Sequence, residues 1–403
     1  MPELSFGSLL VVCLVAIGGP LVVALLPSLR VPAVVLEIVA GIVLGPAVLG
    51  WVEIGPVVEV LAVMGLAFLL FLAGLEIDLR GLRGGPLRVA STGFGLTLLL
   101  GLLVGLGLNA AGWVRSPLLA AIALSATSLG LVVPVLKDAG QAAQPLGQLT
   151  IAAASVADFG AIVALSLLFS EMSASGGAQL LLLGLFAALV VAFALAFSTF
   201  GRNMRFDAIL TGLQDTTAEI RVRIAVALLV AFVALAGEFG FETILGAFLA
   251  GAIVNLVDQD TSTHPHFRLK LEAIGYGFLV PVFFVASGLR FDLDALTDSP
   301  SAFARVPVFV VALLVVRGVP AALYAPRIGR RQAVAAGLLQ ATTLPFLVTA
   351  TQIGVALGEI GPATAAALVF AGLVSVVLFP PVAMAVLRSG PRAATVPAPG
   401  PAV

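Results

Sequence analysis

The sequence is poor in the residues on which disulfides, metal sites and charged surfaces depend. Only 10% of its 403 residues are charged and 61% are hydrophobic, whereas soluble domains carry about 25% charged residues. The single cysteine, Cys13, cannot form an intrachain disulfide, and His264 and His266 have no cysteine or acidic partner at metal-site spacing. The net charge of −1 gives no indication of nucleic acid binding. We therefore expect no metal, no cofactor, no nucleic acid partner and no enzyme activity.

Long apolar runs fill most of the chain. A transmembrane helix needs about 20 mostly apolar residues, and charged and Pro/Gly clusters divide the sequence into about thirteen such segments. We predict an all-α polytopic membrane protein with spans at residues 5–26, 32–50, 57–77, 87–112, 117–136, 147–170, 177–200, 221–237, 241–257, 271–290, 304–323, 332–355 and 362–387. The first run lacks the preceding basic residues of a signal peptide and is predicted to be retained. Residues 389–403 are predicted to be a disordered tail.

The distribution of Lys and Arg predicts the orientation of these spans. With the N-terminus outside, sixteen of the 20 basic residues fall in cytoplasmic segments, three fall outside and Arg317 lies within a span. Cytoplasmic loops of membrane proteins carry an excess of Lys and Arg, and a wrong number of spans would disturb this sorting. We expect a multi-pass protein in the lipid bilayer of a bacterial cell membrane, with the N-terminus outside and the C-terminus in the cytoplasm.

Three short motifs occur twice, at offsets of 214, 210 and 215 residues. The pairs are residues 74–79 (GLEIDL) with 288–293 (GLRFDL), 40–43 (AGIV) with 250–253 (AGAI), and Thr127-Ser128 with Thr342-Thr343. Members of each pair are seven predicted spans apart and so have opposite orientations in the membrane. Such inverted repeats are typical of secondary transporters. We predict two six-helix repeats, residues 1–176 and 201–388, joined by a linker helix at residues 177–200.

Two predicted spans contain helix-breaking sequence at corresponding positions. The fifth has Thr127-Ser128 followed by Gly130 and Pro134, and the twelfth has Thr342-Thr343-Leu344-Pro345. In hydrocarbon the backbone groups freed by a break need partners, and paired interrupted helices point to the transport site of a transporter. Alternatively, these residues only allow close helix packing. We predict two broken helices that cross, with Thr127, Ser128, Thr342 and Thr343 supporting the site.

Asp158 is the one acid in the middle of a predicted span, and Arg317 is the one base within a span. A charged side chain there costs about 2.5–3.5 kcal/mol on insertion scales, so such residues are usually functional. Asp158 is therefore the predicted ion- and proton-binding residue. Arg317 keeps its proton and is predicted to balance charge. A structural ion pair for Asp158, and snorkelling of Arg317 toward the cytoplasm, are the alternatives. Other acids, such as Glu37 and Glu76, are interpreted as interfacial or capping residues.

Five segments occur in an order that is more specific than any one of them. They are residues 71–78 (FLAGLEID), 125–128 (SATS) with 134–138 (PVLKD), 153–160 (AASVADFG), 245–251 (LGAFLAG) and 281–284 (PVFF). Over nearly its whole length the chain thereby resembles the monovalent cation:proton antiporter-2 family. The resemblance implies a homodimer that exchanges Na⁺ or K⁺ for H⁺, with a core that moves like an elevator against a scaffold. It also implies an ion site at Asp158, supported by Ser155 of the same motif, and a basic partner at Arg317.

The chain departs from that family beside the aspartate. The preceding family position is often Asp, Asn or Gln, and here it is Ala157. One deep carboxylate then predicts exchange of one proton for one cation, which is electroneutral. Potassium-efflux relatives often carry a cytosolic nucleotide-binding domain, and we expect no gating by such a domain in cis. The sequence does not distinguish Na⁺ from K⁺.

Other functions remain open at this point. A potassium channel or uniporter needs a filter of backbone carbonyls, and no such loop is evident. A sodium-coupled solute symporter needs polar groups for an organic substrate, and the sequence offers few. An intramembrane aspartyl protease needs two opposed carboxylates, and only Asp158 qualifies.

Overall fold

The computed structural model describes residues 6–26, 32–76, 85–169, 184, 188, 219–257, 266–297 and 300–388. These ranges are helical, and the one isolated β-bridge within them joins Val114 to Ile360. The predicted tail, the predicted linker helix at 177–200 apart from residues 184 and 188, and Asp78 of the first repeated motif lie outside the described residues.

The helices of the first half are α1 (Phe6–Leu25), α2 (Ala33–Leu44), α3 (Pro56–Leu75), α4 (Gly85–Ala110), α5 (Pro117–Ser125), α6 (Leu129–Asp138) and α7 (Pro145–Leu168). Those of the second half are α10 (Ile220–Glu238), α11 (Thr243–Val257), α12 (Phe267–Ile274), α13 (Val280–Leu289), α14 (Leu293–Thr297), α15 (Pro300–Leu313), α16 (Ala325–Ile328), α17 (Arg330–Gln340), α18 (Pro345–Ala356) and α19 (Pro362–Arg388). π-Helical segments at Gly275–Leu279 and Leu314–Gly318, and a 3₁₀ segment at Val319–Tyr324, connect α12 to α13 and α15 to α16.

By length and composition, eight helices of the described part can cross a membrane, or nine if the bent pair α17 and α18 is one span. Three shorter apolar helical segments, Ala33–Leu44, Pro117–Val133 (which includes the end of α5 and the beginning of α6) and Thr243–Leu256, fall on the predicted second, fifth and ninth spans. The predicted eighth and ninth spans are two separate helices, α10 and α11. An all-helical polytopic membrane fold is therefore confirmed, while the count of thirteen spans and the linker stay predictions.

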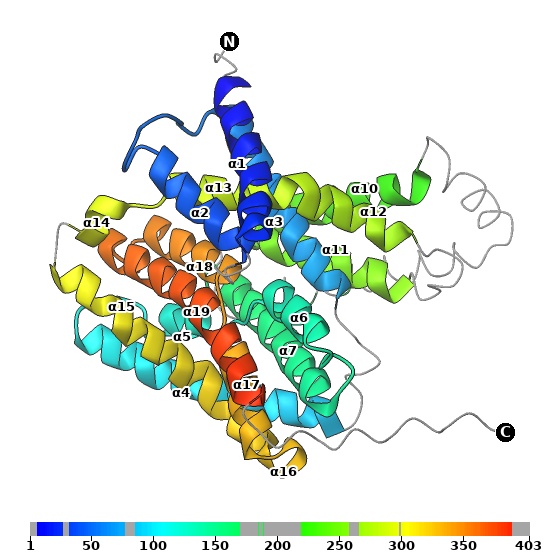
Figure 1. Cartoon of the computed structure of the whole chain (residues 1–403), viewed down its shortest axis with the longest axis vertical. Helices are drawn as coiled ribbons and strands as arrows, with labels where there is room; N and C mark the ends of the chain where they lie inside the picture. Colours follow the sequence, from blue (N-terminus) through cyan, green and yellow to red (C-terminus); the bar gives the residue numbers. More distant parts are fainter. Residues whose placement is uncertain are drawn as a thin grey trace, which may run out of the picture.

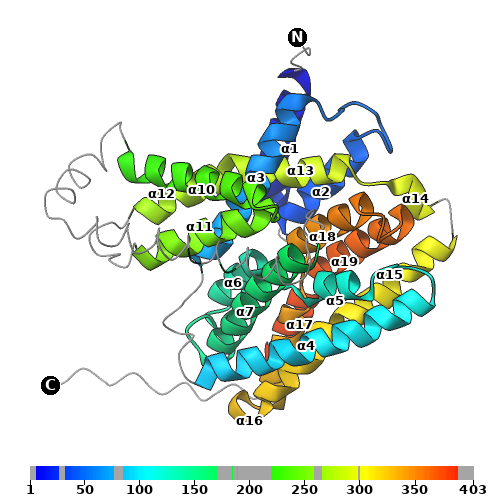
Figure 2. The ribbon, with the colours of Figure 1, turned by 180° about the vertical axis from the view of Figure 1, so that it is seen from behind.

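The helices pack into two groups, which Figures 1 and 2 show one above the other. In the first group, α3 packs on α11, α2 on α13 and α10 on α11, with α1 against α2. In the second group, α4 packs on α5 and α7, and α15, α17 and α18 pack on α19. The groups touch where α7 meets α11 and where α2 meets α19. Each group thus combines three successive predicted spans of one half with three of the other.

Glycines allow the closest helix contacts in the first group. A Cβ at Gly41 of α2 would overlap a carbonyl oxygen of α13, and one at Gly288 of α13 would overlap a carbonyl oxygen of α2. Gly74 of α3 and Gly251 of α11 have the same reciprocal relation. Without a hydrophobic driving force between helices in lipid, such close backbone approach supplies the attraction. All four glycines belong to the repeated motifs, so each contact joins one predicted repeat to the other.

Replacing one of these glycines should destabilise the helix group. We expect Gly288→Ala to lower the free energy of unfolding by about 1–3 kcal/mol, because the new methyl group forces α2 and α13 apart. Thermal unfolding in detergent measures the effect. The control is Gly95→Ala on α4, where an added Cβ meets no atom within 4 Å. Equal stability of the two variants would contradict this account of the packing.

Candidate functional site

Two helices are interrupted where hydroxyl residues cluster. α5 ends at Ser125 and α6 begins at Leu129, while α17 ends at Gln340 and α18 begins at Pro345. The first break therefore lies at residues 126–128 and the second at 341–344. The break in the fifth predicted span comprises Ala126, Thr127 and Ser128, because α6 continues through Gly130 and Pro134. The prediction that these two helices are broken is confirmed by the structure.

The two breaks satisfy each other's backbone groups. The Ser128 N–H donates to the Thr342 carbonyl at 2.9 Å, and the Thr127 hydroxyl donates to the Gln340 carbonyl at 2.7 Å. On the far side of the second break, the Thr343 N–H donates to the Ser375 hydroxyl of α19 at 3.2 Å. Unpaired backbone groups cost several kcal/mol in hydrocarbon. These bonds therefore allow non-helical chain at the centre of the second helix group.

Asp158 lies on α7 directly beside the first break. Its Oδ1 accepts a hydrogen bond of 3.0 Å from the Thr127 N–H. The same side chain lines a cavity together with Ser128 and Leu129, the residues at the beginning of α6. A helix N-terminus favours negative charge. The backbone around Asp158 thus stabilises a carboxylate without supplying a neighbouring cation.

Arg317 is held inside the second helix group, where 1% of its surface is exposed. It lies in the π-helical segment Leu314–Gly318, a type of distortion that is frequent at functional sites. Its Nε donates to the Thr127 hydroxyl at 2.8 Å, its Nη2 donates to the same oxygen, and its Nη1 donates to the Thr97 hydroxyl at 3.3 Å. Snorkelling toward the cytoplasm is therefore wrong as an explanation for this residue.

Two further buried residues, Gln340 and Tyr324, adjoin the hydrogen bonds of Thr127 and Arg317. The Gln340 amide donates to the Tyr324 hydroxyl at 3.0 Å, and both residues are buried. The backbone carbonyl of Gln340 in turn accepts the hydrogen bond from the Thr127 hydroxyl. The C-terminal end of α17, the hydroxyl of Thr127 and the guanidinium of Arg317 thus form one connected network. Helix C-terminal ends favour positive charge, which suits Arg317 to this position.

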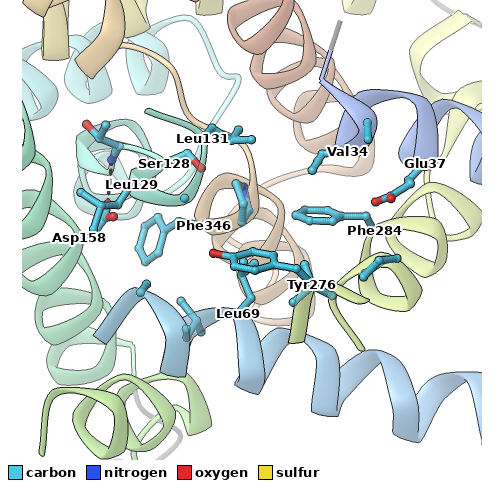
Figure 3. Close-up of a pocket in the computed structure, with 18 of the residues that line it drawn as sticks. Val34, Glu37, Leu69, Ser128, Leu129, Leu131, Asp158, Tyr276, Phe284 and Phe346 are labelled. Carbon is cyan, nitrogen blue, oxygen red and sulfur yellow. Dashed lines mark hydrogen bonds between the residues drawn. The ribbon is translucent and has the colours of Figure 1, made fainter. Parts of the chain in front are cut away.

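The cavity beside Asp158 has a volume of about 230 Å³ and lies between the two helix groups. Its polar lining comes from five side chains: Glu37, Thr127, Ser128, Asp158 and Tyr276. Figure 3 shows Asp158 on one side of the cavity, Glu37 on the opposite side, and the Tyr276 ring between them. The remaining walls are mostly apolar and include Leu69, Leu70, Phe284 and Phe346.

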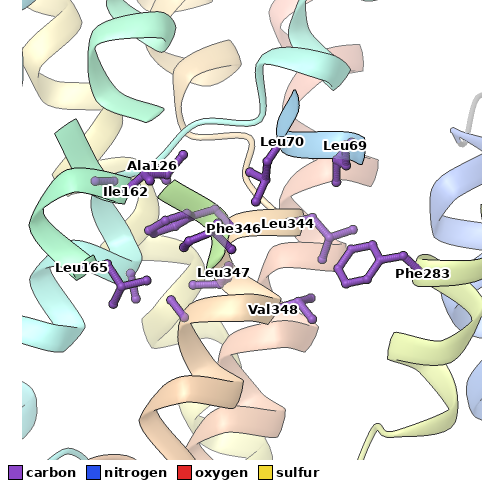
Figure 4. Packing of buried hydrophobic residues seen from close by; sticks show 14 of the residues in the cluster. Leu69, Leu70, Ala126, Ile162, Leu165, Phe283, Leu344, Phe346, Leu347 and Val348 are labelled. Atoms are coloured by element: carbon purple, nitrogen blue, oxygen red, sulfur yellow. The ribbon is translucent and has the colours of Figure 1, made fainter. Parts of the chain in front are cut away.

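A tightly packed apolar cluster joins the two groups next to this cavity. Leu69, Leu70 and Phe283 of the first group belong to the same buried cluster as Ile162, Leu165 and Leu347 of the second. Figure 4 shows these side chains around the two breaks. Such apolar packing offers water and ions no polar partners. The cluster therefore limits the cavity to one side of the site.

The other predicted site residues occupy different positions. Ser155 is buried on α7, does not line the cavity, and its hydroxyl has no hydrogen-bond partner among the described residues. Thr342 contributes its carbonyl to Ser128, and its hydroxyl donates to the Leu338 carbonyl at 3.2 Å. Thr343 is buried in the second break without lining the cavity. These three side chains support the break or pack beneath it and do not face the cavity.

Glu37, interpreted from the sequence as an interfacial or capping residue, is buried in the structure. Only 3% of its surface is exposed, and it lines the cavity. Sequence reasoning also missed Tyr276, which lies in the π-helical segment Gly275–Leu279, and Thr97, a partner of Arg317. The sequence offered one signal for Glu37. Gly41 follows it by four residues and therefore lies on the same face of α2, the face that packs against α13.

Comparison with known proteins shows the family of this chain. The sequence profile of the sodium/hydrogen exchanger transmembrane family matches residues 11–388. The chain belongs to the sodium/hydrogen exchanger family. It is 31% identical over 395 residues to YjbQ of Bacillus subtilis, which covers 94% of this chain and 63% of that protein. It is 32% identical over 272 residues to the Na⁺/H⁺-K⁺ antiporter GerN of Bacillus cereus, covering 66% of this chain and 67% of that protein.

Relatives of this chain include longer proteins. The match to the Na⁺/H⁺ antiporter NhaS5 of Synechocystis is 31% identical over 75% of this chain but spans only 42% of that protein. The matched part of the chain therefore spans 63% of the length of YjbQ and 42% of the length of NhaS5. Among solved structures, the sodium proton antiporter MjNhaP1 of Methanocaldococcus jannaschii has a TM-score of 0.68 at 17% identity, covering 95% of this chain and 98% of that one. This likeness concerns the fold.

Removing Arg317 should weaken the network around Thr127. We expect Arg317→Ala to lower the free energy of unfolding by about 1.5–3 kcal/mol, the usual worth of hydrogen bonds to a charged group. Arg317→Lys should be milder because it keeps the charge. Thermal unfolding in detergent compares them with Arg327→Ala, which removes an exposed arginine of α16. If Arg317→Ala were as stable as Arg327→Ala, the network would have no structural role.

Proposed function

We propose that this chain is a secondary active transporter that exchanges a monovalent cation, Na⁺ or K⁺, for H⁺, and that Asp158 carries the exchanged ion. The observation that carries the proposal is a carboxylate at the break of two helices, open to a cavity and bonded to the Thr127 N–H. Membership of the sodium/hydrogen exchanger family supports the same ions.

Competition for one carboxylate would couple the two fluxes. When Asp158 is protonated it holds no cation, and when it binds a cation it has released its proton. Moving the bare carboxylate through the apolar contact between the helix groups is costly. The site would therefore cross only when it is neutralised by H⁺ or by M⁺. Transport of M⁺ in one direction would then be coupled to transport of H⁺ in the other.

The packing of the helices supports an elevator-type alternating access. Asp158, Thr127 and Arg317 all lie on the second helix group, and the first group supplies only the opposite wall of the cavity. A sliding movement of the second group against the first would carry the intact ion site across the membrane. In this proposal the first group is the scaffold of a homodimer. With the N-terminus outside, the cavity wall formed by Ala33 and Val34 of α2 and Ala73 of α3 belongs to the cytoplasmic ends of these helices.

Asp158→Asn should abolish exchange while the protein still folds, because the amide keeps the shape but has no exchangeable charge. Dye-reported proton movement in proteoliposomes, with Na⁺, K⁺ and Li⁺ in turn, measures this loss. In the native protein the apparent cation affinity should fall as the pH falls, since protons compete for the same group. The matched control is Asp294→Asn, an exposed aspartate of α14. Exchange at the native rate in Asp158→Asn, or a cation affinity independent of pH, would place the coupling group elsewhere.

Exchange should also be electroneutral. Ala157 leaves Asp158 as the one carboxyl in the moving site, and a group that gives up one H⁺ as it accepts one M⁺ transfers no net charge. A membrane potential set with valinomycin should then leave the rate of Na⁺-driven exchange unchanged. The uncoupler-treated liposome serves as the control for proton leak. A clear acceleration, or a steady current on a solid-supported membrane, would mean that a second group travels with Asp158.

A further inference from the structure

The cavity has a second carboxyl on its other wall. Glu37 lies on α2, in the first helix group, and only 3% of its surface is exposed. Figure 3 shows its carboxyl group directed toward the cavity, opposite Asp158. Within the described residues, this side chain forms no hydrogen bond or salt bridge. A buried carboxyl that is not paired is costly in hydrocarbon, so its position calls for a ligand.

The helices around Glu37 offer no cation to balance it. α1 packs against α2 with Gly19, where an added Cβ would lie 3.3 Å from the Glu37 Cγ. The titratable group of α1 is Cys13, α13 has none between its ends, and the basic residue of α19 is Arg388 at its last turn. Across the cavity the titratable groups are Asp158 and Tyr276. Within the part of the chain that the structure describes, the balancing charge is therefore left to a proton or to an ion in the cavity.

We propose that Glu37 is a second binding site for the transported monovalent cation, on the scaffold wall of the cavity, from which the ion passes to Asp158. In this step the Glu37 carboxyl releases its proton to water and its carboxylate binds M⁺. The ion then moves to Asp158, which releases its own proton, and Glu37 is protonated again. Charge and protons balance at each stage. The inference rests on the proposed antiport and deepens it.

Two features of the cavity support this transfer. The polar side chains Tyr276 and Ser128 lie in the space between the two carboxyls, so an ion leaving Glu37 meets oxygen ligands on the way. The Tyr276 hydroxyl is near α6, since a Cβ at Gly130 would lie 3.5 Å from it. Glu37 stands on α2 and would not travel with α7. The one-for-one stoichiometry of the moving site is therefore unchanged.

Proton release on cation binding separates the two sites. Purified protein in weakly buffered detergent solution with a pH dye receives NaCl or KCl, and choline chloride controls for ionic strength. We expect the native protein to release protons, Asp158→Asn to retain a smaller release, and the double variant Asp158→Asn/Glu37→Gln to release none. In proteoliposomes, Glu37→Gln alone should raise the cation concentration for half-maximal exchange roughly tenfold. Glu37→Asp should restore most of that affinity.

The matched control is Glu53→Gln, an exposed glutamate between α2 and α3. Native cation dependence of exchange in Glu37→Gln, or no proton release from folded Asp158→Asn, would overturn the second site. The latter measurement decides the question even if Glu37→Gln does not fold. Failure of the antiport itself would look different, because the native protein would then exchange no cation, or Asp158→Asn would exchange at the native rate.

Discussion

The site depends on one residue, Thr127, that bonds in three directions. Its N–H donates to Asp158 at 3.0 Å, its hydroxyl donates to the Gln340 carbonyl at 2.7 Å, and the same oxygen accepts from Arg317 at 2.8 Å. These bonds exist only because α5 ends two residues earlier and leaves the backbone of Thr127 without a helical partner. In hydrocarbon an interrupted helix must find such partners within the protein. The break, the acid and the base are therefore parts of a single arrangement.

Much of this arrangement could be predicted from the sequence because it depends on residues that are unusual in hydrocarbon. Asp158 and Arg317 were identified by their charge within apolar runs, and the second break by Thr342-Thr343-Leu344-Pro345. Local chemistry was sufficient in these cases, since the cost of a charge or a free backbone group in lipid does not depend on the detailed packing.

The rest depended on three-dimensional packing that a sequence pattern does not contain. Glu37 lies near the beginning of α2 and would be interfacial on a straight, upright helix, but the contacts of α2 with α1 and α13 bury it. Gly130 and Pro134 suggested a longer break, although α6 accommodates both. The π-helical segments that carry Tyr276 and Arg317 add a residue to a helical turn and change the direction of the side chains. Helical periodicity cannot reveal such an insertion.

The separation of Asp158 from Arg317 bears most directly on the proposed antiport. Within the described residues the two form no direct ion pair, and the hydroxyl and N–H of Thr127 stand between them. A direct bidentate pair would hold the carboxylate in a fixed bond with a permanent cation, and H⁺ or M⁺ would have to displace the guanidinium. Here Arg317 donates to the hydroxyls of Thr97 and Thr127 instead. The carboxylate thus keeps an open side toward the cavity, where the proposed antiport requires H⁺ or M⁺ to neutralise it.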